Sequence, residues 1–77
     1  MTPTHAILNV PGVSCNHCKM AIENAVGALD GVELVAVDVA GKSVTVDYDE
    51  AEVTLEAVEA AVREEGYDVA GRTVFGD

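Results

Sequence analysis

Cys15-Asn16-His17-Cys18 is the stretch around which this 77-residue chain is organised, because it holds the only two cysteines and lies where a strand-like pattern gives way to a helix-like one. Two thiols spaced in this way can bind one soft metal ion or close one small disulfide. Two cysteines are too few for a disulfide framework, so the fold must depend on packing. The rest of the chain is therefore interpreted as a scaffold for this pair.

A short strand precedes the pair and a helix follows it. Alternating apolar side chains over 6–10 predict the strand, and Pro11-Gly12 ends it. From about Asn16 the apolar period is that of a helix, and Asp30-Gly31 supplies a C-terminal stop. The residues expected to face inward are Ala21, Ile22, Ala25, Val26 and Leu29.

A β-hairpin and a second helix are predicted next. Residues 35–39 and 44–48 alternate apolar and polar side chains, with a turn at Gly41-Lys42. The second helix starts near Thr54, a suitable N-cap, and ends at Gly66. We expect Leu55, Val58, Ala61 and Val62 to be buried, and Glu56, Glu59, Arg63 and Glu64 to face water.

The remaining residues complete a βαββαβ order. Tyr67, Val69 and Val74 are expected in a last strand, which Gly71 weakens, and 75–77 are expected to fray. This order predicts an α+β, ferredoxin-like fold, with a four-stranded mostly antiparallel sheet and both helices on one face. At this length we expect a single domain over residues 1–77, with a core from about 5 to 70.

The charge balance excludes some classes of partner. Four Lys and Arg residues against fourteen Asp and Glu give a formal net charge of -10. Such a chain should bind neither nucleic acid nor an anionic membrane surface. The acid excess serves solubility, docking to a basic partner surface, or both. The N-terminal residues have no basic start and no long apolar run, so we expect no signal peptide, no membrane insertion and a cytoplasmic protein.

The position of the cysteines favours a particular metal. Cys15 is expected in the loop and Cys18 in the first helical turn, where free backbone N–H groups and the helix dipole lower thiol pKa values. Two soft thiolates suit the low coordination number of Cu(I), whereas Zn(II) wants four ligands. The ligand count therefore favours copper.

Gly12-Val13-Ser14-Cys15-Asn16-His17-Cys18, followed by Gly31-Val32 and later by Gly66-Tyr67, resembles the heavy-metal-associated domain family over about residues 5 to 70. That family includes small bacterial copper chaperones and N-terminal domains of metal-transporting P-type ATPases. The resemblance implies a chaperone that carries Cu(I) on Cys15 and Cys18. It would pass the ion, through three-coordinate intermediates, to a partner such as a copper-transporting P-type ATPase with a similar domain. It also implies a monomer when metal-free and allows a copper-bridged homodimer.

Two residues of the loop differ from patterns seen in this family. Val13 stands where the family usually has Met tucked under the loop, so an apolar support remains and a softer one is lost. Ser14 stands where zinc-preferring relatives place Asp, which lowers the expectation of zinc.

Other residues near the pair are open to two interpretations. His17 is a candidate additional ligand, or an exposed residue at the helix start. Tyr67 either supports the site by packing or by a hydrogen bond to a thiolate, or is a plain residue at the core rim. Lys19 offsets the charge of a loaded site or is simply solvated. His5 and Met20 are expected to have no metal role.

The main competing class is a redox enzyme, because a CxxC motif at a helix start is also typical of thioredoxin-like oxidoreductases. That fold normally needs a longer chain and a cis-proline facing the motif, whereas Pro3 and Pro11 both precede the cysteines. We therefore expect a protein that is not an enzyme. Within metal binding, the alternatives are a zinc or mercury carrier, or a detached metal-binding domain of a transporter.

Overall fold

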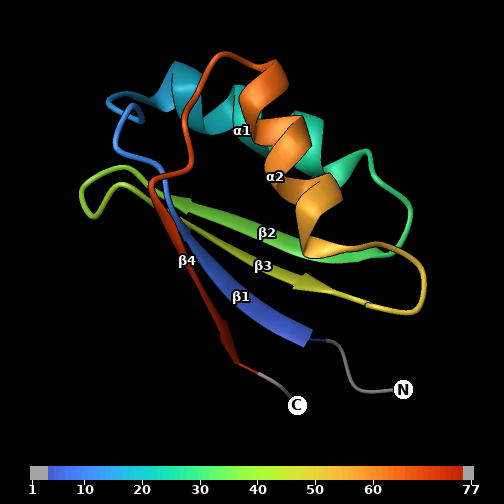
Figure 1. Cartoon of the computed structure of the whole chain (residues 1–77). Helices are drawn as coiled ribbons and strands as arrows, with labels where there is room; N and C mark the ends of the chain where they lie inside the picture. The colour runs from blue at the N-terminus through green and yellow to red at the C-terminus, as the bar shows by residue number, and fades with distance from the viewer. Residues whose placement is uncertain (1–3, 76–77) are drawn as a thin grey trace.

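The computed structural model describes residues 4–75, and Figure 1 shows a sheet with two helices packed on one of its faces. The elements are β1 (Thr4–Asn9), α1 (Asn16–Gly27), β2 (Val32–Asp38), β3 (Ser43–Tyr48), α2 (Leu55–Glu64) and β4 (Gly71–Phe75). The strand order is β2-β3-β1-β4, and every neighbouring pair is antiparallel. The predicted α+β fold and βαββαβ order are therefore confirmed.

The core lies between the sheet and the two helices. Ala6 and Leu8 of β1 are fully buried, and Ala6 pairs with Val46 of β3 and Val74 of β4. The neighbouring residues His5 and Ile7 point to the other face, as alternation along a strand requires. The helices contribute the fully buried side chains Ile22, Val26, Val58 and Val62. This core fixes the ends of β1 and α1, and with them the loop that carries the cysteines.

Helix α1 ends earlier than predicted. Its last residue is Gly27 and its C-cap is Ala28, rather than a stop at Asp30-Gly31. Gly27 is a poor helix former, and the N–H of Leu29 bonds the carbonyl of Val26 at 3.1 Å, which tightens the last turn. Leu29 still packs against the core, so the apolar pattern continued past the end of the helix.

Strand β4 begins later than predicted. Tyr67 and Val69 lie in the loop before it, although both pack against the core. The N–H of Tyr67 bonds the carbonyl of Val62 at 3.4 Å, so this part of the loop is still tied to α2. Pairing with β1 starts opposite Asn9, at Gly71, a residue that an edge strand tolerates at its first position. Phe75 lies in β4, and the rest of the predicted fraying end falls outside the described residues.

Glu59 is buried, and the prediction that it faces water was wrong. Its side chain is only 8% exposed, and its carboxylate lies 3.0 Å from Arg72 of β4 and 3.6 Å from Arg63 of α2. Arg72 pairs with Leu8, whose side chain faces the helices, so Arg72 also lies on the helix side of the sheet. The edge strand thus covers a helix position that α2 alone would leave in solvent.

Candidate metal centre

The two cysteines lie at the start of α1, as predicted. Cys15 is the N-cap residue, in extended conformation with φ -156° and ψ 171°, and its side chain makes no capping hydrogen bond. The first turn contains no acidic side chain. Unpaired backbone N–H groups and the positive end of the helix dipole are therefore left for the thiolates, and favour their negative charge.

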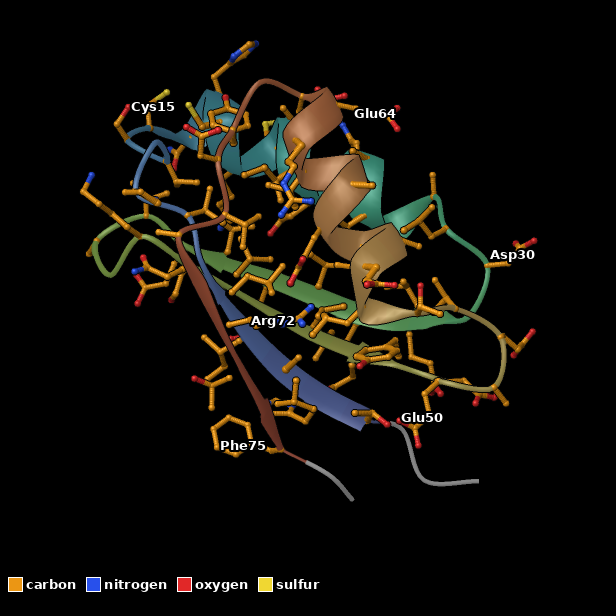
Figure 2. The ribbon with its side chains drawn as sticks, viewed as in Figure 1. Cys15, Asp30, Glu50, Glu64, Arg72 and Phe75 are labelled. Atoms are coloured by element: carbon orange, nitrogen blue, oxygen red, sulfur yellow. The ribbon has the colours of Figure 1, made fainter. Side chains whose placement is uncertain are left out.

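The sulfur atoms of Cys15 and Cys18 are 3.6 Å apart and are not joined in a disulfide. Cys15 is exposed, and Cys18 is half-buried. In Figure 2, Cys15 lies at the opposite end of the molecule from the loops that carry Asp30 and Glu50. Among residues 4–75 no three His, Cys, Asp or Glu side chains are grouped so that they could hold a metal ion. The pair therefore offers two sulfur donors at one end of the molecule.

The pKa of the Cys18 thiol is lowered from 9.0 to about 6. The largest cause is the Tyr67 hydroxyl, which donates a hydrogen bond to the sulfur, followed by the backbone of Ser14 and the thiol of Cys15. The same bond raises the pKa of Tyr67 to about 12, because the phenol is held as a donor. Cys18 is therefore a thiolate at neutral pH, the form that binds soft metals.

Two residues pack beneath or beside the cysteine loop. Val13 is fully buried, and its N–H bonds the carbonyl of Val10 at 3.2 Å. The ring of Tyr67 lies against Gly12, where an added Cβ would come within 3.3 Å of the ring. Glycine at this position lets the loop after α2 approach the loop before α1.

The other candidates are spread around the site. His17 is exposed in the first turn of α1 and joins no three-residue donor group in residues 4–75. Lys19 is half-buried, and Met20 is 60% exposed. His5 lies near the start of β1, at the end of the strand away from the cysteines. Its Nδ1 contacts the carboxylate of Asp47, its cross-strand partner.

Lys42, which the sequence predicts only as part of a turn, also contacts the cysteine loop. Its Nζ donates a hydrogen bond of 3.0 Å to the carbonyl oxygen of Val13. The two residues are 29 positions apart, and no local pattern predicts contact across such a distance.

A βαββαβ fold with a free cysteine pair at the first helix defines a class of small metal-handling domains. The family model of the heavy-metal-associated domain matches residues 7–68, and the chain belongs to this family. None of the helices in residues 4–75 has the length and apolar character needed to cross a membrane.

Several relatives are similar over most of the chain. A copper chaperone CopZ from Staphylococcus haemolyticus is 44% identical, over 82% of this chain and 93% of that protein. The solved structure of a CopZ metallochaperone superposes with a TM-score of 0.84 at 41% identity, covering 86% of this chain and 98% of that one. A third similar structure is the N-terminal domain of a potential copper-translocating P-type ATPase from Bacillus subtilis in its Cu(I)-loaded state. It superposes with a TM-score of 0.81 at 28% identity, covering 95% of this chain and 92% of that one.

Proposed function

We propose that this protein is a copper chaperone that carries one Cu(I) ion on Cys15 and Cys18 and delivers it to another protein. The observation that carries the proposal is the free sulfur pair, 3.6 Å apart at an exposed helix start, with no third donor grouped with it in residues 4–75. Two thiolates satisfy Cu(I), which accepts low coordination numbers, and leave Zn(II) short of ligands. Membership of the heavy-metal-associated family and the relatives named as copper chaperones support this assignment.

Each part of the site has a role in this proposal. Cys18 enters as a thiolate, because its pKa is about 6 and Tyr67 donates to its sulfur. The free N–H groups at the start of α1 stabilise the negative charge, which is -1 in total when two thiolates hold one monovalent ion. Val13 supports the loop from within the core, and Tyr67 supports it from the side.

Transfer proceeds by ligand exchange rather than by release of a free ion. Cys15 is exposed, so a thiolate of an acceptor protein can approach the bound ion beside it. A third sulfur then shares the ion, and the two donor bonds break one after the other as the acceptor's second thiolate binds. The number of thiolates on the ion stays at two or three throughout, and no redox change is needed. The protein therefore acts as a carrier and not as an enzyme.

The acceptor in this proposal is a copper-transporting P-type ATPase with a metal-binding domain of the same fold. The similarity of the Bacillus subtilis ATPase domain to this chain supports such a pairing, because two alike sites can share one ion symmetrically. We place the protein in the cytoplasm as a single domain over 1–77. We expect it to be monomeric when metal-free, with a copper-bridged homodimer, or His17 as a further ligand, arising only in the loaded protein.

A competition titration tests the assignment. Reduced protein is titrated with Cu(I) against a chromophoric chelator of known affinity under anaerobic conditions, with Zn(II) and Hg(II) in parallel. We expect tight Cu(I) binding at one ion per chain and much weaker Zn(II) binding. Cys15→Ala and Cys18→Ala should lose tight binding while their circular dichroism stays that of the unchanged protein.

Four results would contradict the proposal. Failure of Cu(I) to compete while Zn(II) binds would favour a zinc carrier, and a preference for Hg(II) over Cu(I) in cells exposed to both would favour a mercury carrier. Turnover of a disulfide substrate would place the protein among thiol oxidoreductases. Unfolding of the alanine variants would show that the cysteines serve the fold instead of a metal.

A further inference from the structure

Lys42 has an unusual backbone conformation next to the cysteine loop. It lies in the β2–β3 turn with φ 54°, and within residues 4–75 it is the one non-glycine residue at positive φ. Glycine would adopt this conformation without steric cost, and glycine does precede it at position 41. A side chain kept at a strained position suggests that the side chain has a use there.

Lys42 holds both ends of the segment that leads into the cysteines. Its carbonyl oxygen accepts a hydrogen bond of 2.9 Å from the N–H of Val10, and its Nζ donates one of 3.0 Å to the carbonyl of Val13. Val10 and Val13 are themselves joined by a hydrogen bond of 3.2 Å, and both are fully buried. Figure 1 shows the hairpin turn and this segment together at one end of the sheet. One hydrogen bond therefore joins the two ends of segment 10–13, and two more join these ends to the hairpin turn.

The charge of Lys42 is also available at this end of the molecule. The chain has four Lys and Arg residues, and the two arginines lie within 3.6 Å of the buried carboxylate of Glu59. Lys19 and Lys42 remain near the cysteines, one next to Cys18 in the chain and the other bonded to Val13, two residues before Cys15. An ammonium at that place favours a loop that carries a net negative charge.

We propose that Lys42 is a positioning residue of the metal pair: its bond to Val13 holds the loop so that Cys15 stays opposite Cys18, and its ammonium offsets the charge of the loaded thiolates. This inference rests on the proposed copper function. It assigns a part of the site to the hairpin turn, an element that carries neither cysteine.

Three variants test the inference. Lys42→Met keeps the strained backbone and removes the ammonium, and Lys42→Arg keeps the charge and the donor. Lys19→Met is the matched control, since it removes the same charge beside Cys18 without breaking the bond to Val13. In competition titrations, Lys42→Met should bind Cu(I) about fivefold more weakly, as for a half-exposed charged hydrogen bond. Lys19→Met should change the Cu(I) affinity by less than about twofold. Lys42→Arg should bind Cu(I) with the affinity of the unchanged protein.

Amide hydrogen exchange gives a readout in the metal-free protein. Lys42→Met should speed exchange at residues 13–15 and leave α2 unchanged, while Lys19→Met should change neither. Lys42→Gly adds a check on stability, because it relieves the backbone strain. It should melt at a higher temperature than Lys42→Met and bind copper equally weakly, which a purely structural role would not produce.

Each failure points to a different error. If the unchanged protein does not take Cu(I) from the chelator, the copper proposal fails, and exchange at residues 13–15 still decides whether Lys42 orders the loop. If the unchanged protein binds while Lys42→Met matches it in affinity and exchange, the inference about Lys42 is wrong. Equal weakening by Lys42→Met and Lys19→Met would also overturn it, because charge alone would then account for the effect.

Discussion

At the scale of single residues, the contact between Tyr67 and Cys18 decides which protonation form the proposed metal ligand Cys18 takes. The phenol donates a hydrogen bond that only the thiolate accepts well, so the pKa of Cys18 falls to about 6 and that of Tyr67 rises to about 12. Both shifts express one interaction. A metal ion that meets this site at neutral pH therefore does not have to displace a proton from Cys18.

Tyr67→Phe should raise the pKa of Cys18 from about 6 toward its ordinary value of 9.0, because the largest cause of the shift is removed. In the unchanged protein, alkylation of Cys18 should reach its full rate near pH 7 and slow as the pH falls through about 6. In the variant the whole curve should move to higher pH. Rates at each cysteine can be followed by mass spectrometry of fragmented peptides.

Tyr48→Phe is the matched control for this experiment, because Tyr48 is a buried tyrosine of β3 that does not contribute to the pKa of Cys18. It should leave the alkylation curve in place. Equal curves for Tyr67→Phe and the unchanged protein would show that the helix start alone lowers the pKa.

At the scale of elements, the two helices begin differently. Thr54 caps α2, and its hydroxyl accepts a hydrogen bond of 3.1 Å from the N–H of Ala57. Cys15 occupies the same position in α1 and accepts none. Helix α1 thus lacks the side-chain cap that stabilises α2, and its free N–H groups can instead stabilise the negative charge of the thiolates.

Cys15→Ser should stabilise the metal-free protein by about 0.5–1 kcal/mol, since serine at an N-cap accepts the hydrogen bond that cysteine leaves unmade. The same variant should lose tight Cu(I) binding. Urea unfolding of the reduced protein measures the gain. Cys15→Ala is the comparison that removes the sulfur without supplying a cap, and equal stability of the two variants would show that α1 needs no cap.

Strand β4 is tied to α2 through Arg72 and Glu59, an interaction between an edge strand and a buried helix position. Arg72→Met should destabilise the protein by about 1–2 kcal/mol, because it leaves a buried carboxylate with only the more distant Arg63. The expected loss is smaller than is usual for a fully buried pair, since the Arg72 side chain is 49% exposed.

The double variant Glu59→Met with Arg72→Met should recover most of that loss, because no buried charge remains. A double-mutant cycle of urea unfolding, with Glu59→Met as the other single variant, measures the coupling. Additive effects of the two single changes would mean that the pair contributes nothing beyond its separate side chains.

At the scale of the whole molecule, the net charge of -10 works against the compact state, since like charges are drawn together on folding. Raising NaCl from 10 to 500 mM should therefore raise the melting temperature of the metal-free protein, with most of the gain at low salt, as screening predicts. Scanning calorimetry measures it. The double variant Asp30→Asn with Glu50→Gln, at exposed loop positions shown in Figure 2, should respond less to salt. A melting temperature that stays constant with salt would show that repulsion does not limit stability.

Much of the fold was predictable because its signals are local. The change from a period of two before Pro11 to a helical period after Cys15 located the first strand and helix, and Thr54 marked the start of α2. The cysteine pair is visible in the sequence itself, and its place at a helix start followed from the same change of period. Backbone hydrogen bonding and burial of one face act over a few residues, so a short window of sequence carries the information.

Tertiary structure decided what depends on residues far apart in the chain. The burial of Glu59 required Arg72 on a neighbouring strand, and the start of β4 was set by where Asn9 ends its pairing. The bond from Lys42 to Val13 joins a hairpin turn to the cysteine loop. The sequence determined the element order and the two thiols that we propose bind the metal. Only the packed chain decided what surrounds them, because those contacts form when distant segments exclude water together.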